Sequence, residues 1–157
     1  MTAISLRREW PLLLLFTGGI IGIGLVVGLL TEPGGEYIAS LKIPDLIPPQ
    51  WLSTLTWLLL CIAFALAGWR NWLRNSSSLE TRLWLSTLIL SWWYSPVFYV
   101  IRSPLLALAV ILLMAAVMIA FIVRCWSRDR ISAMLFIPRL LWVGYAAAMT
   151  AAIVSMN

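Results

Sequence analysis

The chain has 157 residues, of which 62% are hydrophobic and only 11% are charged, and its net charge is +5. A soluble domain of this length would have about a quarter of its residues charged, so the composition excludes an ordinary soluble protein and indicates a membrane protein. The lack of histidine and the two isolated cysteines exclude the usual zinc sites and a disulfide framework.

Five long apolar stretches follow one another along the chain. A membrane-spanning helix needs about 20 apolar residues, and the third stretch is near the short end of that range. Backbone groups in hydrocarbon must be hydrogen-bonded internally, and no stretch alternates as a barrel strand does, so each is expected to be a helix. The sequence therefore predicts an all-α membrane protein of one domain, a five-transmembrane-helix bundle with helices at 10–30, 50–73, 81–101, 104–124 and 131–155.

The first of these helices follows Arg7 and Arg8. A basic pair before an apolar run is also typical of a cleaved signal peptide. However, the run from Trp10 to Leu30 is longer than a usual signal core, and no convincing small-x-small cleavage site precedes Glu32. We therefore expect a retained helix.

The segment between the first and second helices, residues 31–49, is rich in proline. Pro44, Pro48 and Pro49 each fix their own backbone φ and bias the preceding residue towards extended geometry, so residues 44–49 are not expected to be helical. The double proline is a start signal for the helix that contains Trp51 and Trp57. A stiff loop of this kind, packed over the end of a helical bundle, would form a lid.

Positive charge is distributed unevenly between the two ends of the predicted helices. Short loops rich in arginine stay in the cytoplasm, so we predict a bacterial cell-membrane protein with a cytoplasmic N-terminus, an external C-terminus and the proline-rich loop outside. Arginines at helix ends usually contact membrane lipid, which argues against a nucleic-acid partner. The arginines at the cytoplasmic end are Arg7, Arg8, Arg70, Arg74, Arg82, Arg124, Arg128 and Arg130; the basic residues at the other end are Lys42 and Arg102.

Six tryptophans lie near predicted helix ends, and most of them are expected to be anchors at the membrane interface. Arg139 lies about 12 Å into the last helix, where a charge is costly. It either snorkels to the cytoplasmic interface or meets an anion, which is Asp129, Glu80 or a ligand carboxylate. The six tryptophans are Trp10, Trp51, Trp69, Trp72, Trp84 and Trp126.

Several short motifs occur in order along the chain. Pro48 opens a Pro-Pro-x-Trp motif that is followed by a second tryptophan, and Ser95-Pro96-Val97-Phe98-Tyr99 comes next. Arg102 and Asp129 follow, and Pro138-x-Leu140-x-Trp142 lies in the last helix, with Ala146 and Asn157 beyond it. Together with chain length, helix count and tryptophan content, these motifs resemble the TspO/MBR family, the tryptophan-rich sensory proteins, over nearly the whole chain.

This sequence also departs from the family pattern. The tyrosine after the proline of the last helix is Arg139, and the tyrosine after the second motif tryptophan is Cys61. The glutamine and asparagine of the third helix are Thr87 and Ser91. The chain therefore resembles a divergent member, whose ligand preference does not follow from the family.

The resemblance implies a five-helix bundle, usually a homodimer, that binds porphyrins and other flat hydrophobic molecules beneath its first loop. The implied function is a membrane receptor or binding protein for tetrapyrrole-like ligands with a sensory or regulatory role. The alternatives are a small transporter of porphyrins or sterol-like molecules and a photo-oxidative enzyme that degrades porphyrin. The sequence offers no histidine base or nucleophile constellation for conventional catalysis, no metal site and no cofactor other than a porphyrin-type ligand.

Aromatic residues in such a bundle are more often packing residues or lipid anchors than ligand contacts, and the resemblance reverses this expectation for three tryptophans, at positions 51, 57 and 142. The residues implied to bind ligand are Trp51, Trp57, Phe98, Trp142, Ala146 and Met149, and Pro44, Pro48 and Pro49 belong to the lid loop.

Overall fold

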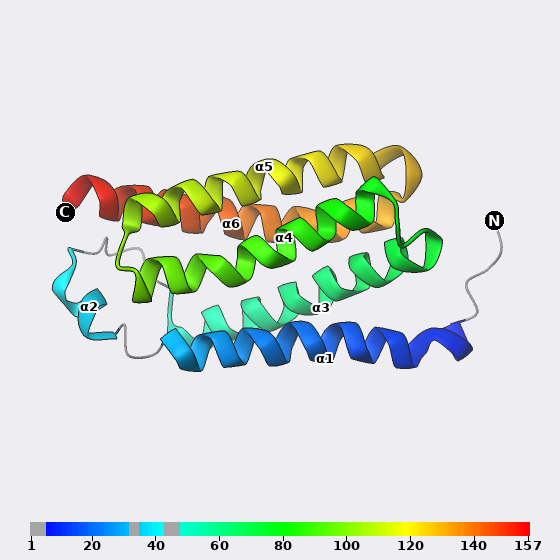
Figure 1. The fold of residues 1–157 in the computed structure, drawn as a ribbon, viewed down its shortest axis with the longest axis horizontal. Coiled ribbons are helices and arrows are strands. Elements are labelled where there is room, and N and C mark those ends of the chain that lie inside the picture. The colour runs from blue at the N-terminus through cyan, green and yellow to red at the C-terminus, as the bar shows by residue number, and fades with distance from the viewer. Residues whose placement is uncertain (1–5, 32–34, 43–47) are drawn as a thin grey trace.

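The computed structural model describes residues 6–31, 35–42 and 48–157, and in that part of the chain it contains helices and no strand. The long helices lie side by side, and the short α2 lies across the end where α1 stops and α3 starts (Figure 1). The prediction of an all-α protein is confirmed. The helices are α1 (Leu6–Thr31), α2 (Gly35–Ser40), α3 (Gln50–Arg74), α4 (Leu79–Ser95), α5 (Pro104–Arg128) and α6 (Arg130–Met156), and a π-helical turn (Pro96–Val100) continues α4.

Four of the helices are long and apolar enough to cross a membrane: α1 from Glu9, α3, α5 and α6. They confirm the prediction of a multi-pass helical membrane protein. The predicted third span, 81–101, corresponds to α4, which has 17 residues, and to the π-helical turn after it. Pro96 has no backbone N–H to donate, and the helical hydrogen bonding changes there. By length and composition the described residues support four spans, so the count of five is not confirmed.

Local sequence signals explain where several helices begin. The Ser78 side chain accepts a hydrogen bond from the Thr81 N–H at 3.1 Å before α4, and Ser103 accepts one from Leu106 at 3.4 Å before α5. Pro49 directly precedes α3, as the double proline predicts. The predicted loop 31–49 differs most from the structure, because it contains α2. This helix has six residues, which is too short for apolar periodicity to reveal.

An aromatic stack crosses the core between α3, α4, α5 and α6. The Trp84 ring lies 5.0 Å from Phe64, and Phe136 lies 5.3 Å from Phe64 and 3.9 Å from Phe121 between ring centroids. The Trp84 Nε1 donates to the Phe64 carbonyl oxygen at 2.9 Å, which satisfies the indole inside the core. Trp84 is therefore a buried packing residue rather than an interfacial anchor, and Trp69 is buried as well. The other four tryptophans that were predicted near helix ends are exposed.

Ion pairs close the end of the bundle that lies opposite α2. Asp129, at the junction of α5 and α6, accepts hydrogen bonds from Arg70 at 2.9 and 3.0 Å and from Ser132 at 2.6 Å, and Arg74 lies 3.2 Å from it. Burial alone raises the pKa of Asp129, but the hydrogen bonds from Arg70 and Ser132 and the charges of both arginines outweigh burial and hold this pKa below its usual value. The network connects the end of α3 to the α5–α6 junction.

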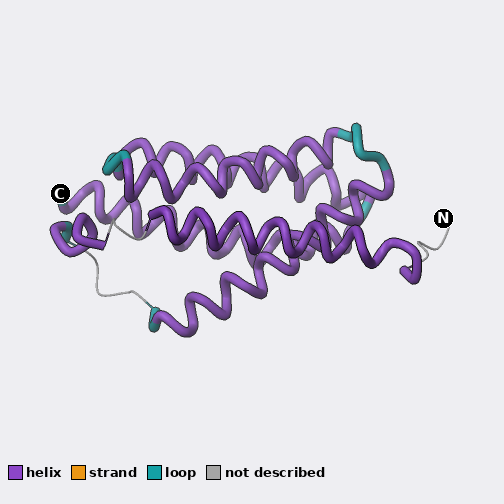
Figure 2. Tube along the Cα trace, turned by 60° about the horizontal axis from the view of Figure 1, so that its bottom comes forward, coloured by secondary structure: helices purple, strands orange, loops and turns teal. Residues whose placement is uncertain are grey.

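The first helix is the least buried of the four spans, and it separates from α3 towards the α2 end. Where the two helices touch, a Cβ at Gly24 would lie 2.7 Å from the Trp57 ring, so the contact depends on glycine. One turn further along α1, a Cβ at Gly28 would have no atom within 4 Å. Figure 2 shows the first turns of α3 standing away from the other helices. This divergence makes room for the site.

Candidate functional site

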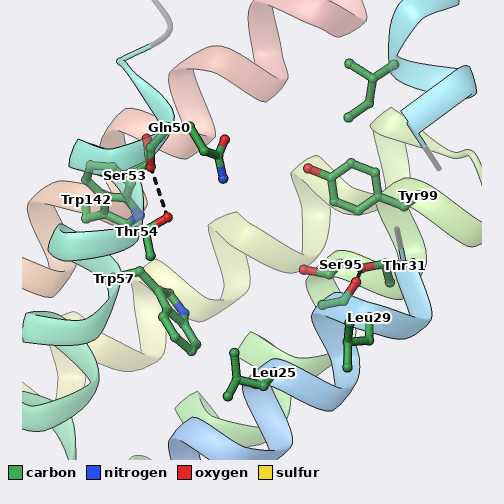
Figure 3. A pocket seen from close by; sticks show the side chains of 13 residues that line it. Leu25, Leu29, Thr31, Gln50, Ser53, Thr54, Trp57, Ser95, Tyr99 and Trp142 are labelled. Atoms are coloured by element: carbon green, nitrogen blue, oxygen red, sulfur yellow. Dashed lines mark hydrogen bonds between the residues drawn. The ribbon is translucent and has the colours of Figure 1, made fainter. Parts of the chain in front are cut away.

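A cavity of about 690 Å³, the larger cavity, lies between α1 and α3 beyond the Gly24–Trp57 contact (Figure 3). Trp57 from α3 and Trp142 from α6 line it on one side, and Tyr99 from the π-helical turn lies across from them. Leu25 and Leu29 make α1 an apolar wall. The lining also includes Gly24, Gly28, Thr31, Ile38, Gln50, Ser53, Thr54 and Ser95.

A second cavity of about 290 Å³, the smaller cavity, adjoins the first. Both are lined by Ile38, Ser53, Tyr99 and Trp142, so they are two parts of one site. The α2 helix contributes Ile38 to both. The remaining lining of the smaller cavity is Leu41, Pro48, Tyr94, Phe98, Tyr145, Ala146, Met149, Thr150 and Ile153.

The structure brings most of the predicted ligand-binding residues together. Trp57 and Trp142 line the larger cavity, and Trp142, Phe98, Ala146 and Met149 line the smaller one. Their contact with a ligand stays a prediction. The α3 helix runs antiparallel to α4 and α6, so the start of α3 lies at the same end of the bundle as the ends of the other two helices (Figure 1). This arrangement explains why residues from all three helices line one site.

Trp51 lies apart from this group. Its side chain is 68% exposed and lines neither cavity. An α-helix turns by about 100° per residue, so the separation of six positions between Trp51 and Trp57 places the two side chains about 120° apart around α3. The two tryptophans of one motif therefore face different surroundings.

The predicted lid residues have different places. Pro48 lines the smaller cavity, whereas Pro49 caps α3, where its carbonyl oxygen accepts from the Leu52 and Ser53 N–H groups at 3.0 and 3.1 Å. Pro44 lies outside the described residues. In the described part of the loop, the element that covers the cavities is α2.

Contacts of Tyr37 with Arg102 and Phe98 hold α2 in place from the α4–α5 side. The Tyr37 hydroxyl donates to the Arg102 carbonyl oxygen at 3.3 Å, and the Arg102 guanidinium lies 5.6 Å from the centre of the Tyr37 ring. The Tyr37 ring also lies 6.3 Å from Phe98. Arg102 has a backbone φ of 57°, which is uncommon for a residue with a side chain. The turn after the π-helical segment thus places Arg102 against Tyr37 of α2.

The chemistry of the site is aromatic and weakly polar. Among the residues that the structure describes, neither lining contains an acidic or basic residue, and no three side chains form a group of metal ligands. The Tyr94 hydroxyl and the Thr150 Oγ1 are hydrogen-bonded at 2.8 Å, and the Thr54 hydroxyl donates to the Gln50 carbonyl oxygen at 3.0 Å (Figure 3). Such a surface can bind a flat apolar molecule by stacking and dispersion.

Sequence reasoning missed Ile38, Tyr94 and Tyr99 as lining residues. Ile38 belongs to α2, which was not predicted. Tyr94 and Tyr99 flank the Ser-Pro motif, and the gathering of aromatic residues there was the available signal. Tyr94 lies at the end of α4, whereas Tyr99 lies within the π-helical turn, where the change in hydrogen-bonding period alters the direction of the side chain.

Arg139 does not snorkel to the interface. Its Nη2 donates to the Ser91 Oγ at 2.8 Å, and its guanidinium carbon lies 4.2 Å from the centre of the Phe64 ring. It also interacts with the Cys61 thiol. The side chain therefore points into the bundle, between α3 and α4, and the snorkelling interpretation is wrong.

Known proteins resemble this chain along almost all of its length. The model of the TspO/MBR family matches residues 15–156. A "Tryptophan-rich sensory protein" of Cereibacter sphaeroides is 28% identical over 156 residues, which cover 97% of this chain and 95% of that protein. "Protein CrtK" of Rhodobacter capsulatus is 28% identical over 83% of each chain, and a "Tryptophan-rich protein TspO" of Chlorobaculum tepidum is 27% identical over 87% of this chain and 92% of that one.

Proposed function

The chain belongs to the TspO/MBR family, and from this premise we propose that it is a membrane protein that binds porphyrins or similar flat hydrophobic ligands and has a sensory or regulatory role. The observation that carries the proposal is the pair of indole rings, Trp57 and Trp142, at one cavity from two different helices (Figure 3). A tetrapyrrole has a large π-surface. Two indole rings at one cavity can stack on that surface, whereas water cannot.

The dimensions of the site support the same ligand class. Ligand cavities commonly have volumes of about 300–1,000 Å³ and apolar, aromatic linings with a few polar groups. The larger cavity has a volume of about 690 Å³, and the smaller cavity extends it beneath α2. The α2 helix is small and rests on few contacts, so it is suited to open and close over a ligand.

The proposal includes a topology. In it α4 and the π-helical turn form a fifth span, because α4 packs alongside α5 and its neighbours through the same thickness (Figure 1). The arginines of the Asp129 end then face the cytoplasm, and α2 and the C-terminus face outwards in a bacterial cell membrane. A homodimer is part of the proposal: a Cβ at Gly18 or Gly22 of α1 would have no atom of this chain within 4 Å, which leaves a surface that a second copy can approach closely.

The test is titration of the purified protein with protoporphyrin IX, following tryptophan fluorescence and then the pigment spectrum over time. Saturable quenching with a stable spectrum supports a binding protein. Quenching that does not saturate contradicts the proposal. A pigment spectrum that changes only when the protein is present indicates an enzyme instead, and ligand flux into liposomes that contain the protein indicates a transporter.

A further inference from the structure

Arg139 is a positive charge inside the bundle, and its partners among the described residues are all neutral. The Ser91 hydroxyl, the Phe64 ring and the Cys61 thiol surround its guanidinium. Its Nε is shielded from solvent and makes no hydrogen bond, and among the described residues no carboxylate forms an ion pair with Arg139. A cation at this depth without a counter-charge is strongly unfavourable, and a hydroxyl and a ring face offset only part of that cost.

The acidic residues that sequence reasoning offered as partners are engaged elsewhere. Asp129 pairs with Arg70, and Glu80 lies 3.5 Å from Arg124 and 3.6 Å from Arg128. All of these groups lie at the end of the bundle opposite α2. The missing negative charge therefore does not come from the described core of the protein.

Arg139 lies close to the larger cavity. Ser95 lines this cavity, and Ser91, which holds Arg139, is one turn before Ser95 on α4, or about 6 Å along the helix. Similar offsets hold on the other two helices: Trp57 lies four residues, about one turn, before Cys61 on α3, and Trp142 lies three residues, slightly less than one turn, after Arg139 on α6. The guanidinium is thus held about one helical turn from Trp57, Ser95 and Trp142, the three lining residues that we call the floor of the larger cavity.

We propose that Arg139 recognises an acidic substituent, a carboxylate, on the flat apolar ligand of the larger cavity. This inference rests on the proposed function. When the ligand enters, the side chain rotates away from Ser91 towards the cavity floor and exchanges a neutral hydroxyl partner for a carboxylate. The guanidinium can donate two parallel hydrogen bonds to a carboxylate, and charge-assisted bonds of this kind are stronger than the bond that is given up. Such a group selects acids over neutral molecules of the same shape.

The experiment compares protoporphyrin IX with its dimethyl ester, which keeps the ring and removes the acids. Both are titrated into the wild-type protein and into the Arg139→Gln variant, with tryptophan quenching as the readout. We expect the wild-type protein to bind the acid about 10-fold more tightly than the ester, the size of one charge-assisted hydrogen bond in excess of a neutral one. In Arg139→Gln the ratio of the two dissociation constants should fall to about one. Arg139→Lys, which keeps the charge but loses the two-pronged geometry, should give a ratio between these values.

Two controls keep the test decisive. Trp93→Ala changes an exposed tryptophan that lines neither cavity and should leave the ratio as it is in the wild-type protein. Ser91→Ala removes the resting partner of Arg139 and should keep or increase the preference for the acid, which gives an answer even if Arg139→Gln does not fold. Equal binding of both probes by the wild-type protein, or a preference for the acid that survives in Arg139→Gln, overturns the inference and leaves the proposed function standing. If neither probe quenches saturably, the proposed function fails and the inference fails with it.

Discussion

The side-chain amide of Asn157 binds the backbone of Lys42 at two points. Its Oδ1 accepts from the Lys42 N–H at 3.0 Å, and its Nδ2 donates to the Lys42 carbonyl oxygen at 3.2 Å. The same Nδ2 donates to the Ile153 carbonyl oxygen in α6 at 2.9 Å. These bonds join the chain just after α2 to the end of α6.

Replacing Asn157 with alanine should therefore loosen α2 and speed ligand release. Both hydrogen bonds to Lys42 are exposed, so we expect their loss to destabilise the closed position of α2 by about 1 kcal/mol. The rate of ligand release should then be about five-fold higher. Stopped-flow release of protoporphyrin IX measures this rate. Ser155→Ala, which removes a local bond to the Ala152 carbonyl oxygen, is the matched control. An unchanged rate in a folded Asn157→Ala variant would show that α2 does not govern release.

Replacing Trp57 with alanine should weaken porphyrin binding by about 1–3 kcal/mol, because one aromatic stacking surface and its burial are lost. Trp142→Ala should have an effect of similar size. Trp93→Ala is the control, since Trp93 is exposed and lines neither cavity. The measurement is the dissociation constant of protoporphyrin IX. Equal losses at all three positions would indicate general destabilisation rather than a binding site.

The packing of Trp84 gives a prediction about stability. A Cβ at Gly68 would overlap the Trp84 indole, whose position is held by its hydrogen bond to Phe64. Gly68→Ala should therefore lower the free energy of unfolding by about 1–3 kcal/mol through overpacking. Gly144→Ala is the control, because its Cβ would have no atom within 4 Å. Thermal unfolding in detergent measures both variants, and a Gly68→Ala variant as stable as Gly144→Ala would contradict the tight Trp84 packing.

The Asp129 network predicts how stability depends on pH. The pKa of Asp129 is lower in the folded protein than its ordinary value of 3.8, so the folded state favours the ionised form. Its contribution to stability is fully present above that ordinary value and is lost as the pH falls through the folded pKa. Asp129→Asn should cost about 1–3 kcal/mol at neutral pH, and its difference from the wild-type protein should shrink below a pH of about 4. Thermal melts of both proteins across this range provide the test, and a constant difference would rule out the ionised carboxylate as the cause.

The proposed topology predicts opposite locations for two reporter fusions. A reporter at Ser77, in the α3–α4 turn, should be cytoplasmic, and one after Asn157 should be external, because an odd number of spans separates the N-terminus from the C-terminus. Activity of a paired cytoplasmic and external reporter at each site provides the measurement. Both fusions on one side of the membrane would contradict a fifth span.

Much of this protein could be predicted from its sequence because the relevant physics is local. Partition into a membrane depends on composition over about 20 residues, and the starts of α3, α4 and α5 depend on Pro49, Ser78 and Ser103 close by. The order of the motifs was sufficient for the family, and the convergence of Trp57, Phe98 and Trp142 on two adjoining cavities follows the pattern that the resemblance implied.

Only the tertiary structure decided what each side chain faces. Trp51 and Trp84 occupy similar positions near helix ends, yet Trp51 is exposed and Trp84 is stacked in the core, because α4 lies against Phe64 and none of the described helices covers Trp51. Arg139 points inwards because Ser91, 48 residues earlier in the chain, offers it an acceptor. Composition determines that a helix enters the membrane, but the direction of a side chain depends on helix phase and on neighbours distant in sequence, which only the packed bundle specifies.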